Sequence, residues 1–534
     1  MAHTEFDYII VGGGSAGCVL AARLSEDPDV KVLLIEAGGD DRNFLFHWPA
    51  GFAKMTKGIA SWGWSTVPQK YMKDRVFWYT QAKVIGGGST INAQIYTRGN
   101  ALDYDGWAQA GCTGWSYRQV LPYFRRSEDN DTFDNEFHGR GGPLAVSQPL
   151  AAGPITEAFI KAAGQLGIPH NLDLSGPDPS GVGHYQLTQR DARRCSTATA
   201  YLKPALSRPN LTVTMTQMVT KVIVENHRAI GVEVLRSGGI ERLHAAREVI
   251  VSAGAIGSPK LLLQSGIGPG AHLKRVGVPV VHDLKGVGEN LQDHLDPCVI
   301  CECTGDHTYD KYGQPLWAAL AGLRYLLTKS GPVASSLFET GGFWYADNNA
   351  PAPDIQMHLG QGSGIEAGIV KLENPGVTLN SALMRPRSRG TVRLASADPA
   401  VAPLIDPNFW SDPYDREMSL RGLKLCRDIM RQDALKPFVK AERLPGPDVQ
   451  TDEQLIDYAC RVAKTDHHPS CACAMGTGEM SVVSPELKVH GLDGLRVCDS
   501  SVMPYVISSN TNAAAIMIAE KGSDMIRGKP ALTG

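Results

Sequence analysis

A glycine motif close to the N-terminus constrains the fold more than any other feature of the sequence. The apolar run 6–11 leads directly into Gly12-x-Gly14-x-x-Gly17, and the residues after it show helical spacing up to Leu24. A second apolar run, 31–35, is closed by Glu36. Strand, glycine turn, helix and strand in this order predict a βαβ unit.

The same motif predicts a ligand. Backbone N–H groups of the glycine turn and the positive end of the helix would face the pyrophosphate of a dinucleotide. Glu36 can accept hydrogen bonds from both hydroxyls of a ribose, and it would repel the 2′-phosphate of NADP. Glycine turns of this spacing also occur without a ligand, but here strand, helix and acid all fall in order. The motif alone leaves FAD and NAD open.

Length, charge and cysteine content exclude several classes of protein. At 534 residues the chain is long enough for roughly three or four domain equivalents, or two large lobes. A net charge of −3 provides no basic field, so no nucleic-acid partner is expected. The eleven cysteines are odd in number and scattered, and Cys298 and Cys301 form a CxxC without a second one at zinc-finger spacing. Neither a disulfide framework nor a metal site is therefore expected.

The sequence also bears on location. The N-terminus has no basic segment followed by a small-residue cleavage site, which favours the cytoplasm. The longest apolar segment, 316–327, is too short to cross a bilayer and contains Arg324. A packed helix is the preferred interpretation of this segment, with a membrane-surface helix as the alternative.

Apolar patterning along the rest of the chain indicates a lobe assembled from separated segments. Alternating residues in 211–234, with a turn at Asn226-His227, predict a β-meander, and the buried strand 247–252 leads to a helix that can begin at Pro259. Strands 354–359 and 376–382 and a helix over 415–432 belong to the region between. We therefore expect an α/β fold with one nucleotide-binding lobe and a second lobe built from the intervening segments.

Longer motifs then point to a family. Residues 82–92 (Ala-Lys-Val-Ile-Gly-Gly-Gly-Ser-Thr-Ile-Asn) place three glycines where the backbone can approach a flat ligand closely. This stretch resembles the first signature of the glucose-methanol-choline (GMC) oxidoreductases, and residues 254–268 match their second signature. Residues 286–294 and 499–519 extend the resemblance over nearly the whole chain.

The resemblance implies FAD held in a discontinuous Rossmann-like lobe, 1–155, 210–310 and 462–534. It also implies a substrate lobe with an antiparallel sheet and helices, 156–209 and 311–461. Some relatives attach FAD to a histidine where this chain has Ile91, so noncovalent FAD is expected. The residues assigned to FAD binding are Gly12, Gly14, Ser15, Ala16, Gly17, Glu36, Ala37, Ala82, Gly87, Asn92, Ala93, Val219, Asp499, Asn510 and Thr511.

A histidine and an asparagine near the C-terminus carry the predicted chemistry. Alcohol oxidation by hydride transfer needs a base for the hydroxyl proton, and histidine has a suitable pKa. His468 matches the family's catalytic histidine, and Asn510 stands where relatives have histidine or asparagine and could donate to the forming alkoxide. Asn510 could also be a helix N-cap. His467 replaces an aromatic residue and is either a second base or a packing substitute.

Residues 195–198, 331–335 and 341–345 look most like those of FAD-dependent L-sorbose dehydrogenases. This implies oxidation of a primary alcohol (a sugar such as L-sorbose, a glycol, or an alkyl or aryl alcohol) to the aldehyde. Electrons would pass to a quinone or dye-like acceptor, with peripheral membrane contact as one way to reach it. A GMC oxidase that uses oxygen and a GMC-fold lyase with non-redox FAD are the alternatives.

Overall fold

The predicted βαβ unit forms the centre of the structure, a computed structural model that describes residues 5–56, 58–236, 239–366 and 368–533. Strand β1 (Glu5–Val11) leads into α1 (Ser15–Leu24) and then β2 (Val32–Ile35). The third motif glycine is needed for close packing: a Cβ on Gly17 would lie 1.9 Å from the Gly12 carbonyl oxygen. Only glycine therefore lets α1 start directly on the turn.

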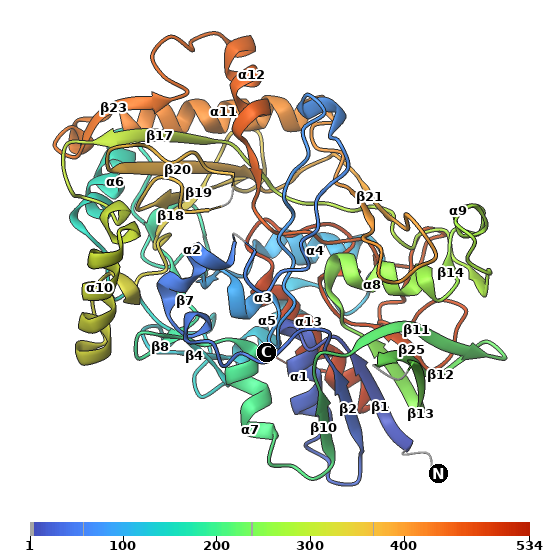
Figure 1. Ribbon diagram of the computed structural model, residues 1–534. Helices are drawn as coiled ribbons and strands as arrows, with labels where there is room; N and C mark the ends of the chain where they lie inside the picture. The colour runs from blue at the N-terminus through green and yellow to red at the C-terminus, as the bar shows by residue number, and fades with distance from the viewer. Residues whose placement is uncertain (1–4, 57, 237–238, 367, 534) are drawn as a thin grey trace.

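The unit belongs to a seven-stranded mixed sheet (Figure 1). β1 pairs in parallel with β2 and with β13 (Gly239–Val251), and β2 pairs in parallel with β10 (Leu211–Thr214). β11 (Met218–Glu225) and β12 (Arg228–Arg236) add antiparallel strands, and β25 (Leu495–Val497) lies parallel beside β13. The turn at Asn226 and His227 has φ values of 48° and 60°, as a two-residue hairpin requires.

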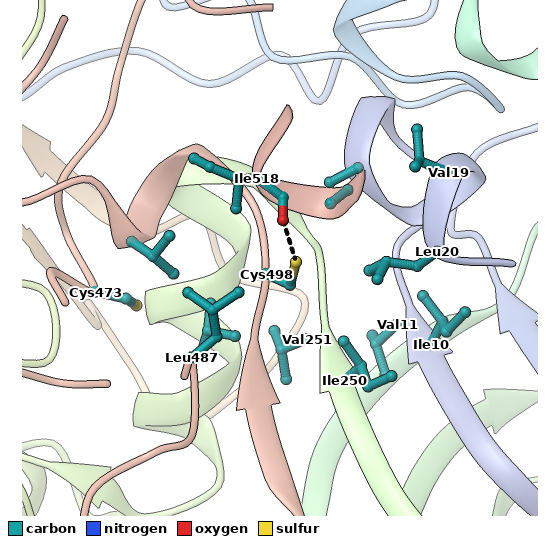
Figure 2. Packing of buried hydrophobic residues seen from close by; sticks show 14 of the residues in the cluster. Ile10, Val11, Val19, Leu20, Ile250, Val251, Cys473, Leu487, Cys498 and Ile518 are labelled. Atoms are coloured by element: carbon teal, nitrogen blue, oxygen red, sulfur yellow. Dashed lines mark hydrogen bonds between the residues drawn. The ribbon is translucent and has the colours of Figure 1, made fainter. Parts of the chain in front are cut away.

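The C-terminal helix completes the core of this lobe. α13 (Asn512–Ile526) packs on α1, and Figure 2 shows Ile518 above the β1, β13 and β25 strand ends. The Cys498 thiol donates to the Ile518 carbonyl oxygen at 3.7 Å (Figure 2). This core therefore joins the first and last segments of the chain in one lobe.

A second sheet stands apart from the first, in the upper part of Figure 1. Its five antiparallel strands run in the order β18 (Thr340–Trp344), β19 (Ile355–Gly360), β20 (Gly376–Leu383), β17 (Cys298–Cys303) and β23 (Val439–Leu444). Every residue of β19 and β20 is buried, and α11 (Pro413–Met430) packs on β20. Both faces of these strands are thus covered.

Other helices connect or cover the two sheets. They are α2 (Phe52–Met55), α3 (Gly88–Ile91), α4 (Ala101–Gln109), α5 (Tyr117–Ser127), α6 (Pro154–Gln165), α7 (Lys203–Ala205), α8 (Gly254–Gln264), α9 (Gly270–Arg275), α10 (Pro315–Thr328) and α12 (Asp452–Val462).

The α/β fold with a discontinuous nucleotide lobe is confirmed, while the exact lobe boundaries stay a prediction. Two interpretations were wrong. The helix expected from Pro259 begins at Gly254, because Ser258 and Asp499 accept hydrogen bonds from the N–H groups of Ala253 and Gly254 at its start. The segment 316–327 is helical, but its leucines face outward rather than into the core.

Two further observations concern the cysteines and the membrane. All eleven cysteines are buried free thiols. Within the described ranges, no helix combines the length and apolarity needed to cross a bilayer.

Candidate active site

One long cavity runs from the glycine turn after β1 to His468 and Asn510, the two candidate catalytic residues. Its volume is about 320 Å³, and it is lined by the ends of β1 and β2, by 82–95, by 252–264 and by the C-terminal loops. Small-molecule sites commonly measure roughly 300–1,000 Å³. The cavity therefore falls within the size range of small-molecule sites.

At the nucleotide end, Glu36 is fixed by the backbone. Its two carboxylate oxygens accept hydrogen bonds from the N–H groups of Gly13 (2.7 Å) and Gly38 (2.6 Å). Burial raises the pKa of Glu36 above its ordinary value, although these N–H groups favour the charged form. A ribose hydroxyl would supply a further donor to the same carboxylate.

A second glycine turn lies directly against the first. Gly87 has φ +54°, and a Cβ there would lie 2.6 Å from the Gly14 Cα atom. The side chains of Gln217 and Gln264 line the cavity, and within the described ranges the Gln217 Oε1 and Gln264 Nε2 atoms have no hydrogen-bond partner. Glycine turns without side chains and two amide atoms without partners are features that suit a polar ligand of dinucleotide size.

The structure brings nearly all of the predicted cofactor residues to this cavity. Gly17 is the exception, because it packs against Gly12 beneath the turn. The residues that line the cavity are Gly12, Gly14, Ser15, Ala16, Glu36, Ala37, Ala82, Gly87, Asn92, Ala93, Val219, Asp499, Asn510 and Thr511. Their individual contacts with a bound cofactor stay predictions.

His468 and Asn510 meet at the other end of the cavity. The Asn510 Nδ2 atom lies 3.1 Å from His468 Nε2. The Asn510 Oδ1 atom accepts from Thr97 Oγ1 (3.0 Å) and from Gln356 Nε2 (2.9 Å), which fixes the orientation of the amide. The amide N–H therefore points at His468, so His468 Nε2 must be an acceptor without a proton.

A second histidine gives the same assignment from the opposite side. His294 Nε2 lies 3.2 Å from the Met384 carbonyl oxygen, which can only accept, so this nitrogen carries the proton. His294 Nδ1 is then the acceptor for His468 Nδ1, 3.0 Å away. The Asp466 carboxylate lies 3.4 Å from the same His468 nitrogen and supports its N–H. Both contacts hold His468 in the tautomer whose Nε2 atom is free to take a proton.

Burial keeps these imidazoles neutral. It lowers the pKa of His468 and of His467 to about 4, and that of His294 to about 3. Burial opposes ionisation of Asp466 as well, but its cationic and imidazole neighbours, Lys464 among them, lower its pKa below the usual range. His468 is therefore an uncharged base next to a fixed negative charge.

A buried ionic cluster supports Asp466. The Lys464 ammonium lies 2.8 Å from Asp296, 3.1 Å from Glu366 and 3.5 Å from Asp466. Burial raises the pKa of Asp296 to about 7 and also raises that of Glu366. Asp296, His358 and Asp466 have ligand atoms within 4.8 Å of one another, and Lys464 supplies positive charge at this point.

Sequence reasoning missed several of these groups. It ended a family motif at His294 without giving it a role, and it passed over Asp466 although this residue directly precedes His467. Gln356 was given no role, yet its amide contacts Asn510. The signal that could have found it was a polar side chain within the predicted strand 354–359.

The structure also gives the surroundings of the two site residues, Asn510 and His467, whose roles the sequence left open. α13 has Thr511 as its N-cap, so Asn510 lies outside the helix and its amide is available to His468. His467 lines the cavity with φ +60°, and neither ring nitrogen has a hydrogen-bond partner in the part of the chain that the structure describes.

Comparison with known proteins then decides the family. The profile of the GMC oxidoreductase N-terminal domain matches residues 6–296, and that of the C-terminal domain matches residues 386–519. The chain belongs to the GMC oxidoreductase family. Among its GMC relatives, the mitochondrial choline dehydrogenase of Homo sapiens is 40% identical over 99% of this chain and 91% of that protein. An oxygen-dependent choline dehydrogenase of Pseudomonas putida is 44% identical over 99% of this chain and 95% of that protein.

Solved structures agree with this placement. Pyridoxine 4-oxidase from Mesorbium loti superimposes with a TM-score of 0.90 at 31% identity, covering 98% of this chain and 100% of that chain. Aspergillus oryzae formate oxidase, studied for its FAD modification, gives a TM-score of 0.92 at 26% identity, covering 99% of both chains. FAD as cofactor and oxidation of an alcohol-type substrate are thus supported for this GMC protein. The two relatives compared by sequence are choline dehydrogenases. The finer resemblance to L-sorbose dehydrogenases stays a prediction.

Proposed function

We propose that this GMC protein oxidises a primary alcohol to the aldehyde and passes the electrons to a quinone or dye-like acceptor. The observation that carries the proposal is the position of the His468 Nε2 atom, which faces the Asn510 amide at the end of the cavity and is assigned no proton on that basis. A neutral buried imidazole there can take the hydroxyl proton of an alcohol. The cytoplasm is the proposed location.

The proposed reaction uses a base, a hydrogen-bond donor, and residues that position or stabilise these two groups. Bound FAD supplies N5 as the hydride acceptor. His468 Nε2 takes the proton, and the imidazolium that forms is stabilised by Asp466 beside its Nδ1 atom. The Asn510 amide donates to the developing alkoxide, since Thr97 and Gln356 already hold its oxygen. The buried setting strengthens these interactions because bulk water does not screen them.

The substrate could be neutral or cationic. Sugars such as L-sorbose, glycols, and alkyl or aryl alcohols are the first candidates. A cationic alcohol is a second candidate because Glu366 and Asp466 line the substrate end, while Lys464 is the cation paired with both. Choline, the substrate in the names of the two relatives above, therefore belongs among the compounds to be tested.

Anaerobic mixing of the yellow holoprotein with these alcohols tests the proposal. A substrate is expected to bleach the flavin absorbance, and a quinone or dye added afterwards is expected to restore it. If no compound bleaches the flavin, the dehydrogenase proposal is wrong. Rapid recovery in air would identify an oxidase, while product formation with the flavin still oxidised would identify a lyase.

FAD is expected to be noncovalent, because the alkyl side chain of Ile91 has no atom that can bond to a flavin. Acid precipitation of the holoprotein should release essentially all of the flavin into the supernatant. Yellow colour that stays with the washed pellet would contradict this expectation.

His294 is proposed as a positioning residue for His468. Leucine at this position removes the acceptor for the His468 Nδ1 proton, so the wrong tautomer becomes populated, and flavin reduction is expected to slow by about 10- to 100-fold with FAD retained. In His294→Asn, an amide oxygen close to the original Nδ1 position should restore much of the rate. Stopped-flow reduction rates per bound flavin measure the difference. Equal rates in the two variants would assign His294 a packing role only.

A further inference from the structure

Helix α10 (Pro315–Thr328) presents large apolar side chains to the outside of the molecule. It lies at the left edge of Figure 1, away from both large sheets. Between 41% and 75% of each of six side chains is exposed, namely Leu316, Trp317, Leu320, Leu323, Leu326 and Leu327. We call these six residues the apolar face. A surface helix normally buries such residues, so an exposed set of this kind marks an interaction site.

The inner side of α10 explains why the leucines point outward. Ala321, Gly322 and Tyr325 are the buried residues of this helix. Gly322 and Tyr325 pack against Trp48, with the Tyr325 and Trp48 ring centroids 5.3 Å apart. The Tyr325 hydroxyl donates to the Ala192 carbonyl oxygen at 2.8 Å. These contacts fix the rotation of the helix, so the apolar face is a stable feature of the fold.

The charged residues within the segment that contains the apolar face, 311–338, are all cations. Residues 311–338 contain no aspartate or glutamate, and their charged residues are Lys311, Arg324 and Lys329. Among the residues that the structure describes, no carboxylate lies within ion-pair distance of Arg324 or Lys329. The Lys311 ammonium is shared between Asp306, at 3.4 Å, and the Trp317 ring. Cations beside an apolar stripe, with an aromatic ring at its edge, complement an anionic lipid surface.

We infer that α10 is an interfacial helix that docks the protein on an anionic phospholipid bilayer. A helix of 14 residues is only about 21 Å long, too short to cross a hydrocarbon core of about 30 Å. It lies flat in the headgroup region, with the apolar face directed at the acyl chains and Arg324 and Lys329 at the phosphates. This inference goes beyond the proposed reaction and does not depend on it.

A second copy of the chain fits the same face less well. The footprint of the helix, about 21 Å by 10 Å, is roughly 200 Å², while a stable dimer buries about 800 Å² per partner. A bilayer does not have this limit, since it is a continuous surface.

Vesicle flotation of the holoprotein tests the inference without any turnover. The wild type is expected to float with vesicles of phosphatidylcholine containing about 30% phosphatidylglycerol and to bind pure phosphatidylcholine more weakly. The triple variant Leu320→Ser, Leu323→Ser and Leu327→Ser should lose about 100-fold or more in partitioning, because three leucines no longer enter the acyl region. Arg324→Gln with Lys329→Gln should abolish the preference for anionic vesicles.

A matched control uses leucines exposed elsewhere. The triple variant Leu150→Ser, Leu172→Ser and Leu206→Ser removes three exposed leucines outside α10 and should float like the wild type. Unchanged flavin absorbance and melting temperature show that each variant is folded. The inference is overturned if the wild type does not float, or if the α10 triple variant floats equally well. It is also overturned if that variant instead abolishes a dimer seen by sedimentation.

Discussion

Replacing His468 with alanine is expected to slow anaerobic flavin reduction by about 10²- to 10⁴-fold while the protein keeps its FAD. The imidazole Nε2 atom is the base in the proposed reaction, and alanine leaves no group that can take the hydroxyl proton. His468 contacts Asn510, His294 and Asp466 rather than the nucleotide end of the cavity, so cofactor binding should change little. Stopped-flow absorbance measures the rate per bound flavin.

His467→Phe is the matched control for this variant. His467 is a second imidazole that lines the same cavity, and phenylalanine keeps a flat aromatic ring at this position while removing both ring nitrogens. We expect a loss of less than about 10-fold, because a second imidazole that shapes the pocket is not needed for proton transfer. An equal loss in both variants would mean that the two histidines share the base role. Loss of FAD in His468→Ala, with an unaltered rate per remaining flavin, would refute the assignment.

Lys464→Met is expected to lower the stability of the protein by about 3–5 kcal/mol. Methionine fills much of the space but leaves Asp296, Glu366 and Asp466 buried without their ammonium partner. The Lys464 side chain is only 6% exposed, so solvent does not screen this loss. The melting temperature of the holoprotein should fall by several degrees or more.

The pH dependence of this variant follows from the raised pKa values. Burial already raises the pKa of Asp296 to about 7 and that of Glu366 above its ordinary value, and removing the cation raises both further. A carboxyl whose pKa is higher in the folded state stabilises the fold at low pH, and this stability is lost as pH rises through the folded pKa. The deficit relative to wild type should therefore be larger at pH 8 than at pH 6.

The double variant Lys464→Met with Asp296→Asn provides the control, since it removes the closest carboxylate together with the ammonium. It should recover part of the lost stability. A melting temperature of Lys464→Met that equals wild type at both pH values would mean that the cluster does not stabilise the protein through charge.

Local patterns were sufficient for the parts of the fold that depend on neighbouring residues. The strand, glycine turn and helix at residues 5–24 follow from apolar spacing and from the absence of side chains at Gly12, Gly14 and Gly17. Spacing within α10 indicated a helix but not its rotation, because helical periodicity gives the angle between residues and not the side that meets the protein. The contact with Trp48, far away in sequence, decides that rotation.

By itself, the sequence determined the family and FAD as the cofactor, and it led to the proposal of His468 and Asn510 as catalytic residues, because glycine spacing and signature motifs are local properties of the chain. Only the tertiary structure decided what surrounds His468. The proton on its Nδ1 atom depends on His294, and the charge beside it depends on the cluster around Lys464, with Asp296 168 residues away in the chain. Hydrogen bonding and desolvation are set by atoms that meet in space, and no spacing rule specifies which distant polar groups will share one buried site.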